Sequence, residues 1–134
     1  MCTLVSCASN NYKNESCKKN GEIAEDYLFG PKVSGARSVE SYRNGLKTLP
    51  RGIVYKTYNR SLRENRDLEG RLIFKIAILG DGTISNIETI HSTIDDCGFV
   101  NKIYSIYKGL KFEDIEQTND KSIFINELEF SGAA

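Results

Sequence analysis

Three residues of the types found in hydrolase triads stand close together near position 91, but their spacing argues against catalysis. His91 is the only histidine of the chain, and Ser92 and Asp95 follow it. Successive residues of a strand point to opposite faces of a sheet, so we expect the side chains of His91 and Ser92 to diverge. A general base must reach its nucleophile at hydrogen-bond distance. We therefore expect His91 to be a strand-surface histidine and the protein to be non-enzymatic.

The other polar clusters have structural explanations. Gly80-Asp81-Gly82 has the glycines of a phosphate loop, but it joins two predicted strands, and no Lys-Ser/Thr pair follows it. Asp95 and Asp96 are candidates for calcium binding or for helix capping, and capping is favoured. The acidic run at residues 113–116 is typical of a solvated surface. We predict no catalytic residue, no metal site and no cofactor.

Four cysteines raise the questions of metal binding, cross-linking and lipidation. Their positions, Cys2, Cys7, Cys17 and Cys97, fit no zinc-ligand spacing. A Cys17–Cys97 disulfide and a free thiol at Cys97 both stay open. Leu4-Val5-Ser6-Cys7 resembles a bacterial lipobox, which makes Cys7 a lipidation candidate. Six residues precede it, without Lys or Arg, so either the true start lies upstream or the match is a coincidence.

Composition restricts the class of protein. The chain has 134 residues, enough for one domain with its own core. Eighteen basic and eighteen acidic residues give zero net charge, which argues against nucleic acid and against a polybasic membrane surface. A local basic stripe, Lys56, Arg60 and Arg63, is typical of a solvated helix face. The apolar run 72–79 is far shorter than the ~20 residues of a membrane-spanning helix.

Hydrophobic periodicity predicts an ordered region over residues 38–130. Residues 1–37 are rich in Asn, Lys, Ser and Gly and are expected to form a flexible tether, while 131–134 form a loose tail. Ser38 is a candidate N-cap for a first helix with an apolar stripe at Val39, Tyr42, Leu46 and Leu49. Asn44-Gly45 weakens that helix and Pro50 interrupts it. A second helix, up to about residue 65, carries Val54, Tyr58 and Leu62.

The following segment changes to a period of two. Residues 72–79 alternate as expected for a central strand, and Asp81-Gly82 indicates a hairpin into a second strand over 83–93. Ile84, Ile87 and Ile90 are three apart, which requires a bulge or a strong twist. Asp95 or Asp96 then caps a helix with Phe99, Ile103 and Leu110 on its buried face. The last strand covers 122–130. The order α-α-β-β-α-β predicts an α+β fold with a three-stranded antiparallel sheet.

The stretch from Tyr58 to Phe112 resembles the TonB C-terminal domain superfamily, in particular its AgmX/PglI C-terminal subtype. The resemblance is carried by Tyr58, Leu62 and Asn65, then Leu68-x-Gly70, then the Asp81-Gly82 hairpin and Ser92-Thr93 at the end of the second strand. Family members have proline at the positions of Arg66 and Glu113. They have tryptophan at that of Leu110, and facing cysteines at those of Thr57 and Lys102. The resemblance implies a TonB C-terminal-like fold with two helices before β-β-α-β.

The resemblance also implies a function. A TonB-like module binds an outer-membrane or envelope protein partner, in transport or gliding-motility energy coupling. It lies in the periplasm, here with a membrane anchor through Cys7. With a strand order of two-one-three, the last strand lies at the sheet edge, where an extended peptide adds to it. The expected partner-binding residues are Ser122, Ile123, Phe124, Ile125, Asn126, Glu127 and Leu128. The alternative is a structural envelope lipoprotein that self-associates, as a homodimer, through the same strand.

Overall fold

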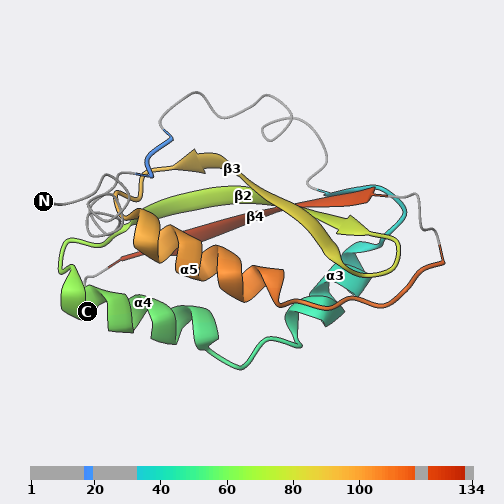
Figure 1. Cartoon of the computed structure of the whole chain (residues 1–134), viewed down its shortest axis with the longest axis horizontal. Coiled ribbons are helices and arrows are strands. Elements are labelled where there is room, and N and C mark those ends of the chain that lie inside the picture. The colour runs from blue at the N-terminus through green and yellow to red at the C-terminus, as the bar shows by residue number, and fades with distance from the viewer. Residues whose placement is uncertain (1–16, 20–32, 117–120, 132–134) are drawn as a thin grey trace, which may run out of the picture.

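The computed structural model describes residues 17–19, 33–116 and 121–131. Within these ranges, three helices and a four-stranded antiparallel sheet follow the predicted order, with one additional short strand at the start. Their bounds are β1 Val33–Ser34, α3 Val39–Leu46, α4 Ile53–Glu64, β2 Gly70–Leu79, β3 Ile84–Ser92, α5 Cys97–Lys108 and β4 Lys121–Phe130. Figure 1 shows α4 and α5 side by side along one face of the sheet, with α3 beyond the end of α5. None of the helices in the described residues is long and apolar enough to span a membrane.

The sheet order is β1-β4-β2-β3, which confirms the α+β class and the central position of β2. The predicted three strands are β3-β2-β4, and β1 adds to the outer side of β4. Two bulges interrupt β3, because Ile90 and Ser85 have no partner across from them in β2. Each bulge adds one residue to β3 and restores contact with the core for Ile84 and Ile87. The bulge alternative, rather than twist alone, therefore explains the three-residue spacing.

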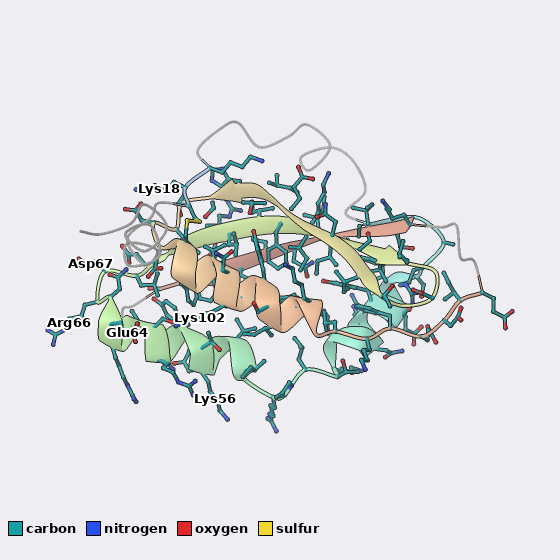
Figure 2. All side chains as sticks on the ribbon, viewed as in Figure 1. Lys18, Lys56, Glu64, Arg66, Asp67 and Lys102 are labelled. Carbon is teal, nitrogen blue, oxygen red and sulfur yellow. A yellow bond between two sulfur atoms is a disulfide. The ribbon has the colours of Figure 1, made fainter. Side chains whose placement is uncertain are left out.

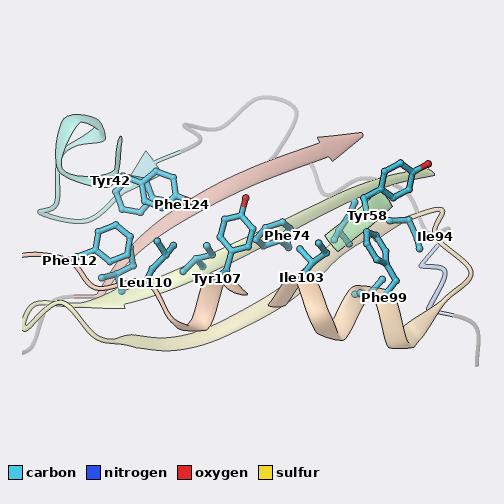
Figure 3. Close-up of a cluster of buried hydrophobic side chains, with 14 of the residues drawn as sticks. Tyr42, Tyr58, Phe74, Ile94, Phe99, Ile103, Tyr107, Leu110, Phe112 and Phe124 are labelled. Carbon is cyan, nitrogen blue, oxygen red and sulfur yellow. The ribbon is translucent and has the colours of Figure 1, made fainter. Parts of the chain in front are cut away.

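The core lies between the sheet and the helices. Even-numbered residues of β2 face α4 and α5 because side chains alternate along a strand. Phe74 packs against Tyr107 and Tyr104 of α5, with ring centroids 5.0 and 5.3 Å away. Tyr58 of α4 contacts Phe99, and its hydroxyl donates to the Leu68 carbonyl at 2.7 Å. Figure 3 shows this cluster running the length of the sheet.

The helices begin and end close to their predicted limits. The Ser38 side chain caps α3 by accepting from the N–H of Ser41 at 3.0 Å, and Asp96 caps α5 by accepting from Phe99 N–H at 3.0 Å. One predicted core position is wrong. Val39 is 43% exposed, because the first turn of α3 turns it away from the core that Tyr42 enters. Leu46 and Leu49 pack against the core as expected.

The predicted boundary at residue 38 is too late. Cys17 forms a disulfide with Cys97, with Cα atoms 4.9 Å apart, so the cysteine pair is oxidised rather than free. Lys19 forms a two-way backbone bridge with Ser92 at the edge of β3. Arg37 is only 2% exposed. Residues assigned to the tether are therefore attached to the domain at both edges of the sheet. Residues 1–16, 20–32, 117–120 and 132–134, which include Cys7 and much of the predicted tether and tail, lie outside the described residues.

Candidate functional site

The candidate site is the outer side of β4, the strand that the sequence places at the edge of the sheet. Its register with β2 is unbroken from Gly70–Phe130 to Leu79–Lys121. Phe124 is buried in the core, and Leu128 and Phe130 pack against it, so the even-numbered side chains face the helices. The odd-numbered side chains lie on the other face of the sheet. β4 is therefore a strand of regular register, with its even-numbered side chains toward the core and its odd-numbered side chains on the opposite face.

Main-chain hydrogen bonds at the opposite edge determine which backbone groups of β4 point outward. The N–H and C=O of Ser92 both bond to Lys19, so they point away from β2. Ser92 is paired with Leu72 of β2. Because Ser92 does not bond to Leu72, the N–H and C=O of Leu72 must point toward β4. Leu72 is paired with Leu128, so Leu128 and the other even-numbered residues bond to β2. The outward-pointing main-chain groups of β4 belong to Ile123, Ile125, Glu127 and Glu129.

The beginning of β4 is already occupied by the same chain. Ser34 pairs with Ile123 and Val33 with Phe124. The N–H of Arg37 donates to Oγ of Ser122 at 3.0 Å. Gly35, at φ 99°, brings the backbone so near Ser122 that a Cβ atom would lie 2.7 Å from its Cα. The prediction that Ser122, Ile123 and Phe124 are available to a partner is therefore wrong. Among the described residues, no strand pairs with the outer side of β4 from Ile125 to Phe130.

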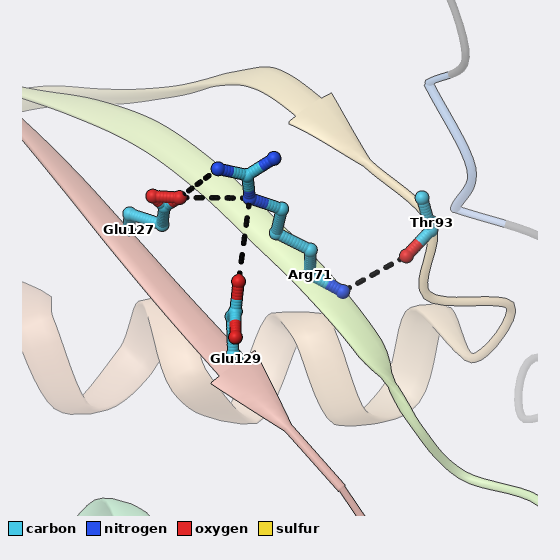
Figure 4. Close-up of polar contacts among 4 residues, drawn as sticks. All are labelled: Arg71, Thr93, Glu127 and Glu129. Atoms are coloured by element: carbon cyan, nitrogen blue, oxygen red, sulfur yellow. Dashed lines mark hydrogen bonds and ion pairs between the residues drawn. The ribbon is translucent and has the colours of Figure 1, made fainter.

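Charged side chains surround this second half of β4. Arg71 of β2 donates from Nε to Oε1 of Glu127 at 2.7 Å, and a second guanidinium nitrogen contacts the same oxygen. Oε1 of Glu129 lies 3.8 Å from Nε of Arg71. Figure 4 shows both glutamates reaching toward this guanidinium. Arg71 and Glu127 each have a further interaction partner. Charged side chains at a strand edge reduce unselective pairing with other strands.

On the other face, Tyr42 of α3 fixes the middle of the strand. Its hydroxyl donates to Oδ1 of Asn126, and its ring stacks on Phe124 with centroids 4.2 Å apart. Burial raises the pKa of the Tyr42 hydroxyl, so it stays a protonated donor. Nδ2 of Asn126 is buried without a hydrogen-bond partner among the described residues. The edge is thus rigidly held on its inner side.

The other edge of the sheet is less suited to strand addition. β3 carries two bulges, and bulges disturb the regular spacing of outward N–H and C=O groups. Lys19 already pairs with Ser92, and its ammonium group donates to the Thr89 carbonyl at 2.7 Å. Regular outward-pointing backbone therefore favours β4 over β3 as the interaction edge.

Arg37 bonds to the start of β4 through its main-chain N–H, and the burial of its side chain was not predicted from the sequence. Its guanidinium donates to Oγ of Ser41 at 3.1 Å and to the Leu79 and Gly80 carbonyls at 3.1 and 3.4 Å. It also lies 5.5 Å from the Phe112 ring centroid. An arginine in a predicted polar tether carries no local signal of burial. Its partners come from α3 and the β2–β3 turn, which only the fold brings together.

The remaining candidate residues separate in the structure. His91 of β3 pairs with Ile73 of β2. The adjacent Ser92 is fully buried, and its Oγ accepts a hydrogen bond from the N–H of Ile94 at 3.1 Å. Asp95 forms an ion pair with Lys18 at 3.9 Å. In the part of the chain that the structure describes, no three His, Cys, Asp or Glu residues come together as a metal site. Cys7, the lipidation candidate, is not among the described residues.

Comparisons with known proteins give a structural likeness. The sequence matches no protein family and no curated protein. Two solved structures are similar to the fold. Both are TonB C-terminal domains. The domain from Pseudomonas aeruginosa has 17% identity and a TM-score of 0.45 over 78% of this chain and 90% of that one. The domain from Helicobacter pylori has 13% identity and a TM-score of 0.42 over 84% of this chain and 96% of that one. The AgmX/PglI subtype stays a prediction.

Proposed function

We propose that this protein is a non-enzymatic, TonB-like interaction module that binds a cell-envelope protein by adding an extended peptide to β4. The observation that carries the proposal is the asymmetry of this strand. Its inner side pairs with β2 over all ten residues, whereas among residues 17–19, 33–116 and 121–131 its outer side pairs with β1 at Ile123 and Phe124. Outward-pointing N–H and C=O groups at Ile125 and Glu129 form the docking edge. These groups give affinity without regard to sequence, as in other cases of strand addition.

The side chains along this edge specify the kind of peptide. An added strand would place alternate residues beside Leu128 and Phe130 on one face and beside Glu127 and Glu129 on the other. Apolar residues fit the first face, and Lys or Arg fits the second. The expected partner segment therefore alternates apolar and basic residues.

The disulfide supports a location outside the reducing cytosol. Cross-links between cysteines persist in the periplasm and in other oxidising compartments. The Cys17–Cys97 bond therefore agrees with a periplasmic module that couples a partner to the envelope, as in transport or gliding motility. A lipid on Cys7 would place it at a membrane surface.

Two proline variants test the docking edge. Ile125→Pro removes an outward N–H and leaves the ladder with β2 intact, so it should abolish partner capture from an envelope extract. Thr89→Pro is the matched control, because Thr89 pairs with Phe74 and therefore points its main chain outward from β3. Ile125→Ala controls for the side chain. Circular dichroism confirms that each variant is folded.

The outcomes separate the two functions. Partner capture that survives Ile125→Pro, or that Thr89→Pro abolishes equally, would contradict docking on β4. The alternative, self-association through this edge, predicts a dimer in sedimentation velocity that Ile125→Pro converts to a monomer. A monomeric wild-type protein that captures its partner supports the interaction module.

A further inference from the structure

The short strand β1 enters the sheet from the direction of the proposed docking edge. It is antiparallel to β4, with Val33 opposite Phe124. The chain that precedes Val33 therefore arrives from the side of Ile125. Residues 20–32 lie outside the described residues. If the end of this segment stays extended, it runs along the outer side of β4, where a partner peptide is proposed to bind.

Contacts that follow β1 in the sequence fix its position on β4. The main-chain N–H of Arg37 donates to Oγ of Ser122 at 3.0 Å. Gly35, at φ 99°, lies so close to β4 that a Cβ atom would come within 2.7 Å of the Cα of Ser122. These described residues hold the register of β1. The same register determines which residue of β4 lies opposite each residue that precedes β1.

This register gives the preceding residues main-chain partners. Extended backward from β1, it pairs even-numbered residues of the segment with residues of β4 whose N–H and C=O groups point outward. The pairs are Lys32 with Ile125, Gly30 with Glu127, and Leu28 with Glu129. In an antiparallel ladder, such pairs exchange both main-chain hydrogen bonds. Odd-numbered residues of the segment point their main-chain groups away from β4.

The proline of the segment stands where this pairing needs no N–H group. Pro31 comes opposite Asn126, and its nitrogen points away from β4 in this register. The missing donor therefore breaks no hydrogen bond to β4. Proline at such a position also prevents a further strand from adding to the new edge. The proline favours this register over one shifted by a single residue.

The side chains of the segment match the neighbours that the register gives them. Gly30 has no side chain, which leaves room for the ion-paired carboxylate of Glu127. Lys32 comes diagonal to Glu127 on the same face, within reach of a long side chain. Phe29 comes beside Leu128 on the other face, where Leu128 packs against the hydrophobic core. Charge and apolar surface therefore both support the pairing.

We propose that residues 28–32 pair with the β4 edge as an internal competitor of the partner peptide. This inference rests on the proposed docking at β4 and adds its regulation. The segment is attached at both ends, through the Cys17–Cys97 disulfide and the Arg37 contact, so its effective concentration at the edge is high. A partner must displace it. An edge that is unoccupied in about one molecule of ten binds the partner about tenfold more weakly.

Hydrogen exchange of the full-length protein tests the pairing without any partner. The N–H of Ile125 should exchange slowly, because it donates to the carbonyl of Lys32. Lys32→Pro removes the N–H that points toward β4 and should accelerate this exchange at least about tenfold. Val33→Pro is the matched control, because the nitrogen of residue 33 points away from β4 and exchange at Ile125 should not change. Lys32→Ala controls for the charge.

A synthetic peptide with the sequence of residues 27–32 measures the competition. Titrated into isotope-labelled protein, it should shift the amide resonances of Ile125 and Glu129. It should bind the Lys32→Pro variant at least about tenfold more tightly than it binds the unaltered protein or the Val33→Pro variant. Equal affinities for all three proteins would overturn the competition.

The remaining outcomes separate this inference from the proposed function. Fast exchange at Ile125 in the unaltered protein would overturn the internal pairing and leave partner docking standing. Slow exchange that depends on protein concentration would assign the edge to a second copy of the chain and overturn it as well. Partner capture that survives Ile125→Pro would refute docking on β4, and the competition with it, whatever the exchange result.

Discussion

The disulfide between Cys17 and Cys97 allows the clearest quantitative prediction. The two cysteines are 80 residues apart, so the bond closes a loop that includes most of the domain in the unfolded chain. The chain-entropy relation for a loop of that length gives about 4.5 kcal/mol of stabilisation at 25 °C. A domain of this kind typically has about 5–15 kcal/mol of total stability. We therefore expect loss of the disulfide to remove about 30% or more of the free energy of unfolding.

The perturbation is Cys17→Ser in a background that carries Cys2→Ser and Cys7→Ser, so that Cys97 has no other partner. Cys17 is replaced rather than Cys97 because Cys97 is only 7% exposed. A serine at position 97 would add a buried hydroxyl, which would itself destabilise the protein. Urea unfolding followed by circular dichroism should show a lower midpoint and a larger slope, because the uncrosslinked unfolded chain exposes more surface.

Reduction of the background protein by dithiothreitol is the matched control and should reproduce the same loss. Hydrogen exchange should report faster exchange at Ser92, whose N–H bonds to Lys19 only while residues 17–19 are attached. Equal midpoints with and without the bond would refute the reasoning, since the attachment would then contribute nothing to stability.

Three further predictions concern the interior. Gly45→Ala should destabilise the protein by about 1–3 kcal/mol in urea unfolding, because a Cβ would overlap the Phe112 ring. Alanine favours helices, so a stabilised variant would contradict this packing. Arg37→Met should cost about 3 kcal/mol in the same assay, because two carbonyls and Oγ of Ser41 lose their donor, while Arg43→Met at the surface should cost little. Burial raises the tyrosine pKa values, so the contribution of these groups to stability should be constant below about pH 10 and fall above it, as unfolding releases protons. A flat stability profile from pH 9 to 11 would contradict this. The tyrosines concerned are Tyr42, Tyr104 and Tyr107.

Much of the fold follows from local pattern. The alternation in residues 72–79 predicts a central strand, and β2 is indeed paired on both sides. Asp81-Gly82 predicts the turn between β2 and β3, and Asp96 is the predicted cap of α5. Each of these features depends on neighbouring residues, so the sequence contains the whole signal. Gly45 shows the limit of this approach, because the sequence marks it as a weak point, whereas the fold uses its missing side chain to seat Phe112.

The candidate site was predicted in part for the same reason. The order of elements predicts that the last strand lies beside β2, which is confirmed. The predicted edge position is wrong at the start of the strand, where β4 lies between β1 and β2. The pairing of Ser34 with Ile123 was missed, since two residues in a polar segment give no periodicity.

The order, type and approximate limits of the predicted helices and strands follow from the sequence, because periodicity, capping and turn chemistry are local properties. Three contacts became visible only in the folded chain: Cys17 with Cys97, β1 with the start of β4, and Arg37 with the β2–β3 turn. These contacts join residues 42 or more positions apart. They form only after the core has brought the elements together, because each alone gains too little to offset the entropy of closing so long a loop.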